Sequence, residues 1–151
     1  MDIEELLTRD RSYVLDEAFA ALKRSHPAHY DQAGDAFTRD RLASLFDLVV
    51  TALHDRELAP VGAYCEEIAS RRFSAGFDIT EVQTAFNTLE EAMWRRVVVG
   101  VPGPELAEAV GLLSTVLGFG KDALARRYVS LATARHVPSL DLSALFDGTE
   151  R

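Results

Sequence analysis

The sequence of 151 residues is poor in several features that mark special classes of protein. It has one cysteine, Cys65, so no disulfide can form within the chain, which fits a reducing compartment. It has no run of about 18 apolar residues, the length that a membrane-spanning helix needs. Its N-terminus, residues 1–5, is acidic and lacks the basic-then-apolar order of a signal peptide. We therefore expect a cytoplasmic protein with no membrane contact.

Positive charge is also scarce. The chain has 16 lysines and arginines against 24 aspartates and glutamates, a net charge of −8. Its arginine pairs, such as Arg71-Arg72 and Arg95-Arg96, extend into no longer basic run. Affinity for nucleic acid depends on neutralising phosphates with lysine and arginine. We therefore expect no nucleic-acid partner.

Motifs of catalysis and metal binding are missing as well. Gly118 and Gly120 precede Lys121-Asp122 rather than a Lys-Ser or Lys-Thr pair, so they form no phosphate loop. Cys65 lies on the apolar face of an expected helix and has no basic neighbour that would activate a thiol. The histidines lack the spacing of a helical zinc site, and none lies where a helical bundle would hold haem; they are His26, His29, His54 and His136. We expect no enzyme, no metal and no cofactor.

Apolar residues are abundant, at 48% of the chain, and they recur with the period of an α-helix. The pattern predicts an all-α protein: a single helical bundle of five main helices, followed by a short C-terminal helix or tail. The helices are expected over about 4–23, 38–58, 60–75, 78–100 and 105–135. Residues 1–136 would form the domain. Residues 137–151 would form an amphipathic tail that covers an apolar surface with Leu140, Leu142, Leu145 and Phe146.

Several helix ends have recognisable signals. Thr38 is the expected N-cap of the second helix, and Pro60 suits the first turn of the third. Gly76 follows the third helix where a left-handed C-terminal residue is expected. Asp78 and Glu81 have the spacing of a capping box at the start of the fourth helix.

Small residues recur every seven positions along the fifth helix, at Gly111, Gly118, Ala125 and Ala132. A glycine inside a helix costs about 1 kcal/mol relative to alanine, so such a stripe needs a packing reason. One interpretation is a close helix crossing inside the bundle. The other is a seam between two subunits of a dimer.

Polar residues follow one side of the fourth helix at helical spacing, and Trp94 lies among them. The side could simply face solvent. Alternatively, Asn87 and Trp94 could join Ser114 of the fifth helix to line a pocket between these two helices or a subunit contact.

Two blocks of sequence resemble a known family. They are the block from Arg41 to Pro60 and the block Arg72-Phe73-Ser74-Ala75-Gly76-Phe77-Asp78-Ile79-Thr80-Glu81-Val82-Gln83-Thr84-Ala85-Phe86-Asn87. With the helix that contains residues 118–124, they resemble the RsbRD-type N-terminal domain, the sensory module of RsbR-like stressosome co-antagonists and related bacterial regulators. The resemblance covers roughly residues 10–134.

The resemblance implies a sensory domain with a globin-like fold that binds no haem, that dimerises, and that passes a signal to an attached output module. The sequence runs to Arg151, and we expect no output domain on the same chain. We therefore expect a non-catalytic signal-input domain in bacterial stress response, acting as a homodimer and binding a regulatory protein partner. The alternative is a small-molecule sensor with a pocket between helices four and five, whose ligand the sequence does not identify.

Overall fold

A computed structural model describes residues 2–140 of the chain. These residues form seven helices and no strand: α1 (Ile3–Arg9), α2 (Arg11–Arg24), α3 (Ala28–Ala33), α4 (Asp35–Asp55), α5 (Ala59–Ser74), α6 (Ile79–Gly100) and α7 (Gly103–Leu140). The predicted all-α class is confirmed. No helix in this part of the chain is both long and apolar enough to cross a membrane.

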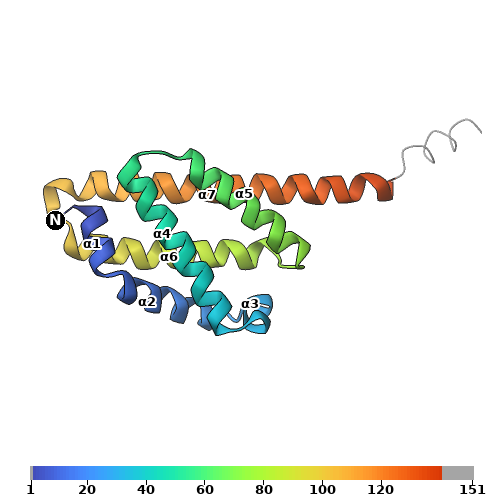
Figure 1. The fold of residues 1–151 in the computed structure, drawn as a ribbon, viewed down its shortest axis with the longest axis horizontal. Helices are drawn as coiled ribbons and strands as arrows, with labels where there is room; N and C mark the ends of the chain where they lie inside the picture. Colours follow the sequence, from blue (N-terminus) through green and yellow to red (C-terminus); the bar gives the residue numbers. More distant parts are fainter. Residues whose placement is uncertain (1, 141–151) are drawn as a thin grey trace, which may run out of the picture.

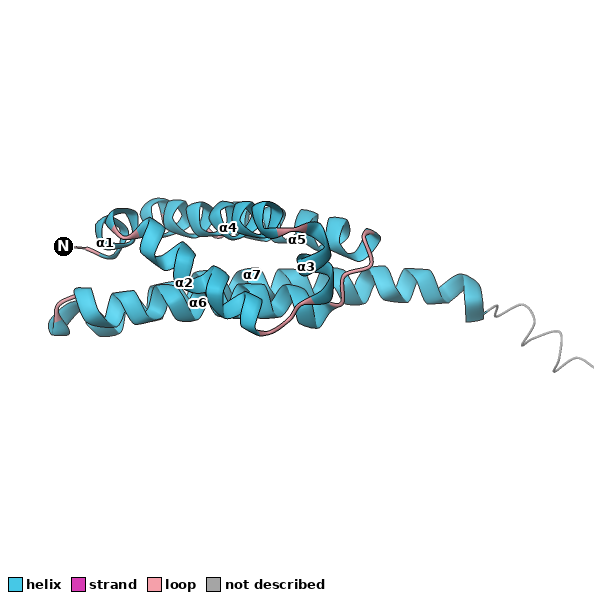
Figure 2. Cartoon of the chain, turned by 90° about the horizontal axis from the view of Figure 1, so that it is seen from below, coloured by secondary structure: helices cyan, strands magenta, loops and turns pink. Residues whose placement is uncertain are grey.

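The helices pack in two layers. α6 and α7 run along the long axis of the molecule, and α4 and α5 cross over them (Figure 1). In the perpendicular view, α4 and α5 form one layer and α6 and α7 the other (Figure 2). α7 packs against α4, α5 and α6, while α2 packs against α4 and α6. The last turns of α7 extend past the ends of the other helices (Figure 1).

The apolar stripe of α6 shows how the sequence builds the core. Its members are spaced three or four residues apart, so they share one face of the helix. All are buried, as predicted from the spacing: Val82, Phe86, Leu89, Met93 and Val97. They belong to one continuous cluster of buried apolar residues to which each of the seven helices contributes. Burial of this apolar surface is the main stabilising contribution to the fold.

The predicted boundaries of α5 and α6 are confirmed. Pro60 lies in the first turn of α5, and Gly76 follows this helix with a φ angle of +85°. Asp78 caps α6, because its carboxylate accepts the backbone N–H of Thr80 at 3.0 Å. Glu81 completes the capping box by accepting the backbone N–H of Asp78 at 3.1 Å. Short-range hydrogen bonds therefore set both ends of the α5–α6 connection.

The first predicted helix is wrong in one respect, because it is two helices that meet at Asp10. The Asp10 carboxylate accepts hydrogen bonds from Arg9 Nε at 3.0 Å and from Arg96 Nε at 2.6 Å. These two arginines hold the pKa of Asp10 well below its ordinary value. The break is thus held by a residue of α6, far along the chain, which no local pattern could indicate.

Thr38 is not the N-cap of the second predicted helix, so that prediction is wrong. Gly34, with a φ angle of +100°, precedes α4, and the helix begins at Asp35. Thr38 is buried one turn further on, where its hydroxyl donates to the carbonyl oxygen of Gly34 at 3.1 Å. The segment between the first two predicted helices contains the short helix α3.

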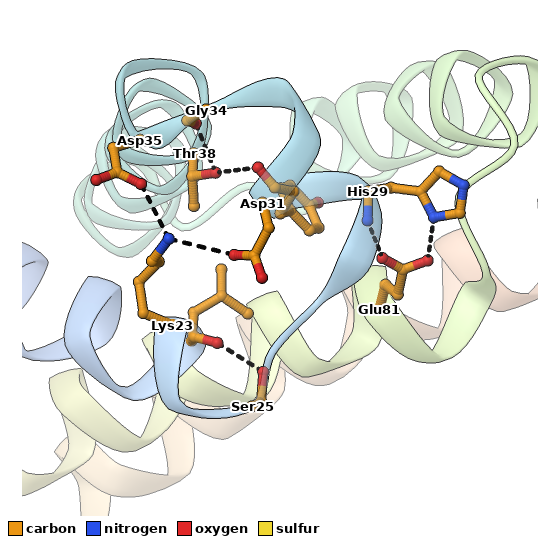
Figure 3. A network of polar contacts seen from close by, with 10 residues as sticks. Lys23, Ser25, His29, Asp31, Gly34, Asp35, Thr38 and Glu81 are labelled. Atoms are coloured by element: carbon orange, nitrogen blue, oxygen red, sulfur yellow. Dashed lines mark hydrogen bonds and ion pairs between the residues drawn. The ribbon is translucent and has the colours of Figure 1, made fainter.

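α3 is held by polar contacts with its neighbours (Figure 3). Lys23 Nζ contacts Asp31 Oδ1 at 3.3 Å and Asp35 Oδ1 at 3.1 Å, linking α2, α3 and α4. Glu81 of α6 accepts both the backbone N–H and the ring Nδ1–H of His29, at 2.8 and 2.6 Å. A helix of six residues is too short to be stable alone, so these contacts fix its place.

The last helix is longer than predicted. α7 continues to Leu140 and includes Pro138. The sequence predicts an end near Arg135, because the proline that follows disfavours the helical conformation of the residue before it. The residue before a proline is biased away from the helical region rather than barred from it, which is why the signal was wrong here. Most of the predicted amphipathic tail, residues 141–151, lies outside the described residues.

Candidate functional site

The face of α7 that points away from the bundle is its most unusual surface. Buried residues line the opposite face, which packs on α5 and α6; they are Ala109, Leu113, Val116, Leu117, Gly120, Ala123, Leu124 and Tyr128. The predicted small-residue stripe lies on the outward face. Gly111 is exposed, and Gly118, Ala125 and Ala132 are half-buried. Among the described residues, a Cβ added at Gly111 or Gly118 would meet nothing within 4 Å. No helix crossing inside the bundle explains these two glycines.

The close crossing inside the bundle uses a different pair of glycines. A Cβ at Gly120 would lie 3.1 Å from Cys65 Sγ and 3.2 Å from Val61 Cγ1 on α5. A Cβ at Gly62 of α5 would lie 2.9 Å from Cε1 of Phe119. These glycines let α5 and α7 approach closely. Gly120 lies two residues after Gly118, so it falls on the apolar side of α7 and not in the outward stripe. This spacing is the sequence signal that separates the roles of the two glycines.

Several large apolar side chains are exposed on α6 and α7. Trp94 and Val98, four residues apart on α6, are 44% and 41% exposed. Val129 of α7 is 64% exposed and lies four residues after Ala125, so it extends the outward stripe. Isolated exposed apolar residues are common, but an exposed tryptophan is typical of a contact surface.

The three residues predicted to line a pocket lie on or near this surface. Asn87, Trp94 and Ser114 are all exposed. Lys121 of α7 donates to Asn87 Oδ1 at 3.3 Å and to Glu90 Oε2 at 3.1 Å, which ties α6 to α7. The cavities that stand out in the described part of the chain are lined by other residues. A ligand-binding role for the three residues stays a prediction, and Lys121 is the partner that sequence spacing did not indicate.

Catalytic chemistry has little support in this part of the chain. Within residues 2–140 no three histidine, cysteine, aspartate or glutamate side chains gather closely enough to hold a metal ion. Cys65 is buried between α5 and α7, and burial raises the pKa of its thiol to about 12. The thiol is therefore protonated at neutral pH and serves as a small core side chain.

The fold defines a class, an all-α domain in which one long helix extends past the ends of the others (Figure 1). Comparison with known families is more specific. The family model described as the RsbT co-antagonist protein rsbRD N-terminal domain matches residues 12–142, most of the chain. The chain therefore belongs to this family, which confirms the resemblance seen in the sequence. No curated protein and no solved structure matches it.

Membership in this family indicates a regulatory input domain of the kind associated with stressosomes, rather than a catalytic one. The family match says nothing of the contacts that such a domain makes. Those contacts have to be inferred from the outward face of α7 and its surroundings.

Proposed function

We propose that the protein is a signal-input domain that acts as a homodimer through the outward face of α7. The open stripe at Gly111 and Gly118 carries this proposal. Each glycine costs about 1 kcal/mol of helix stability, and nothing in the described chain packs on either of them. A second helix that approaches this face would use the space that the missing side chains leave.

A second copy of the same chain is the partner that fits this surface best. A spacing of seven residues keeps the stripe nearly in line along the helix, because seven residues make almost two turns. Two identical stripes can therefore meet about a two-fold axis, the commonest symmetry of dimers. Trp94 would then supply a large apolar contact at the side of the interface, where tryptophan is enriched. The dimer would hand its signal to a regulatory protein partner.

Gly118→Arg tests the interface directly. An arginine side chain on the open stripe should keep two helices apart while leaving the monomer fold intact, because a Cβ at Gly118 meets nothing within 4 Å in the described chain. We expect sedimentation velocity at 10–50 μM (about the range for moderate dimers) to give a dimer for the wild type and a monomer for the variant. Gly118→Ala is the matched control and should stay dimeric. A monomeric wild type would refute the proposal.

Trp94 provides an independent measurement, because it is the only tryptophan in the sequence. Its side chain is 44% exposed in the single chain and should lose contact with water in the dimer. We expect its fluorescence maximum to move to shorter wavelength as the protein concentration rises through the dissociation constant. Gly118→Arg should keep the long-wavelength emission at every concentration. Emission that does not depend on concentration in a dimeric wild type would place the interface elsewhere.

A further inference from the structure

Charge is divided unevenly between the two halves of α7. Residues 103–120 carry two glutamates and no lysine or arginine. Residues 121–140 carry four lysines and arginines and one aspartate, in a chain whose net charge is −8. A helix whose two halves differ in charge has a preferred direction in which it pairs with a copy of itself, because like charges repel and opposite charges attract.

Three of the four cations on α7 already contact their own chain. Lys121 pairs with a glutamate of α6 at 3.1 Å, and Arg127 Nε donates to a serine hydroxyl of α5 at 3.1 Å. The charged carbon of Arg135 lies 6.0 Å from the centre of a phenylalanine ring of α5. Arg126 and Glu108 are both exposed, and neither forms an ion pair with a described residue. These two side chains are open to a partner.

Glu108 and Arg126 lie on the same flank of α7. They are 18 residues apart in the sequence, which is five full turns at 3.6 residues per turn, so they point in the same direction. At about 100° per residue, this direction lies about 80° to one side of Gly118, at the border of the outward face. The position midway between them is residue 117, next to Gly118. A two-fold axis that crosses α7 at this point therefore brings each of the two positions level with the other.

We propose that the two subunits pair antiparallel: α7 of a second copy lies on the outward face of α7 in the opposite direction, with the two-fold axis near Gly118. Glu108 of each copy then lies level with Arg126 of the other, on the same side of the interface. Two symmetric ion pairs form across the dimer. This inference rests on the proposed homodimer and adds the direction in which its subunits pair.

A parallel dimer leaves both side chains without such a partner. In a parallel pair each residue lies level with its own copy, so the nearest cation on the partner's α7 is 13 residues from Glu108, or about 20 Å along the axis. That cation is Lys121, which lies about 60° to the other side of Gly118 and is paired with α6. Exposed ion pairs contribute only about 0–1 kcal/mol each, so the charges select the direction while the stripe supplies the contact area.

Single cysteines on the stripe report the direction. About an axis at Gly118, position 111 of one copy meets position 125 of the other. We expect a mixture of Gly111→Cys and Ala125→Cys, left to exchange subunits and then oxidised, to give a disulfide-linked heterodimer. Neither variant should cross-link by itself, because two copies of one position lie about 21 Å apart and a disulfide needs Cα atoms within about 7 Å. The natural thiol, Cys65, is buried and takes no part. A longer tag on one variant separates heterodimer from homodimer on a gel.

Charge reversal provides a second test. Glu108→Arg or Arg126→Glu alone places like charges opposite each other at two points, and each should raise the dissociation constant about tenfold or more. The variant that carries both changes restores opposite charges and should return close to the wild-type value. The matched control is Arg127→Glu, whose side chain contacts α5 of its own chain and which should leave the dissociation constant nearly unchanged.

The outcomes separate this inference from the proposed function. A monomeric wild type would overturn both. A dimer in which Gly111→Cys cross-links with itself would be parallel, and this would overturn the direction while the homodimer stands. A dimeric wild type whose mixed variants give no heterodimer, or a double charge reversal that stays as weak as the single ones, would also overturn the antiparallel pairing.

Discussion

Replacing Gly120 with leucine should lower the free energy of unfolding by about 1–2 kcal/mol, one of the two largest changes that we expect. A Cβ at this position already lies within 3.2 Å of Val61 and 3.1 Å of Cys65, so the longer side chain forces α5 and α7 apart. Overpacking of this kind costs about 1–3 kcal/mol or more, and the gain in helix propensity of about 1 kcal/mol offsets only part of it. Urea unfolding followed by circular dichroism measures the change.

The matched control for this experiment is leucine at Gly118, two residues earlier on the same helix. A Cβ there meets nothing within 4 Å in the described chain, so the variant should be as stable as the wild type or more stable. The unfolding of both variants should be measured in dilute solution, where association does not contribute to stability. Equal losses of stability at Gly118 and Gly120 would show that the outward face is not open.

Glu81→Ala should cost about 3 kcal/mol, the second large change. The carboxylate accepts the backbone N–H of Asp78, the backbone N–H of His29 and the ring N–H of His29. Hydrogen bonds to a charged group contribute about 1.5–3 kcal/mol each, and those on one carboxylate are not additive. The variant loses the Glu81 half of the capping box of α6 and the anchor of α3 together, while the Asp78 cap remains. Glu91→Ala, which removes an exposed partner of Arg95 on the same helix, is the control and should change stability little.

The same carboxylate predicts how stability depends on pH. Burial acts to raise the pKa of Glu81, but the N–H groups of His29 and Asp78 outweigh it, so the pKa is lowered. A lowered carboxyl pKa contributes stability that is complete above the unfolded value of about 4.3 and is lost as the pH falls through the folded value. We expect the wild type to lose more stability than Glu81→Gln between pH 6 and pH 3. Parallel pH profiles would contradict this.

The sequence predicted the features that depend on residues close together in the chain. The capping box of Asp78 and Glu81, the left-handed Gly76 and the inward stripe of α6 all follow from local hydrogen bonds and helical spacing. The helix break at Asp10 did not, because it is held by Arg96, 86 residues away. The second role of Glu81, as the anchor of His29, is likewise a contact across 52 residues.

The candidate sites divide in the same way. A repeat of seven indicated the small-residue stripe, because residues on one helix face can be read from spacing alone. Whether anything covers that face depends on how the other helices pack, and this required the structure.

The part of α7 beyond the bundle has a mechanical consequence. Leu140 lies twelve residues after Tyr128, which is buried, and so about 18 Å further along the helix at 1.5 Å per residue. A helix of this length acts as a stiff rod, so a small tilt of α7 among its neighbours displaces its far end, and a small twist rotates it. Each residue turns the helix by about 100°, so the number of residues in this rod sets the side of the helix on which its last residue lies.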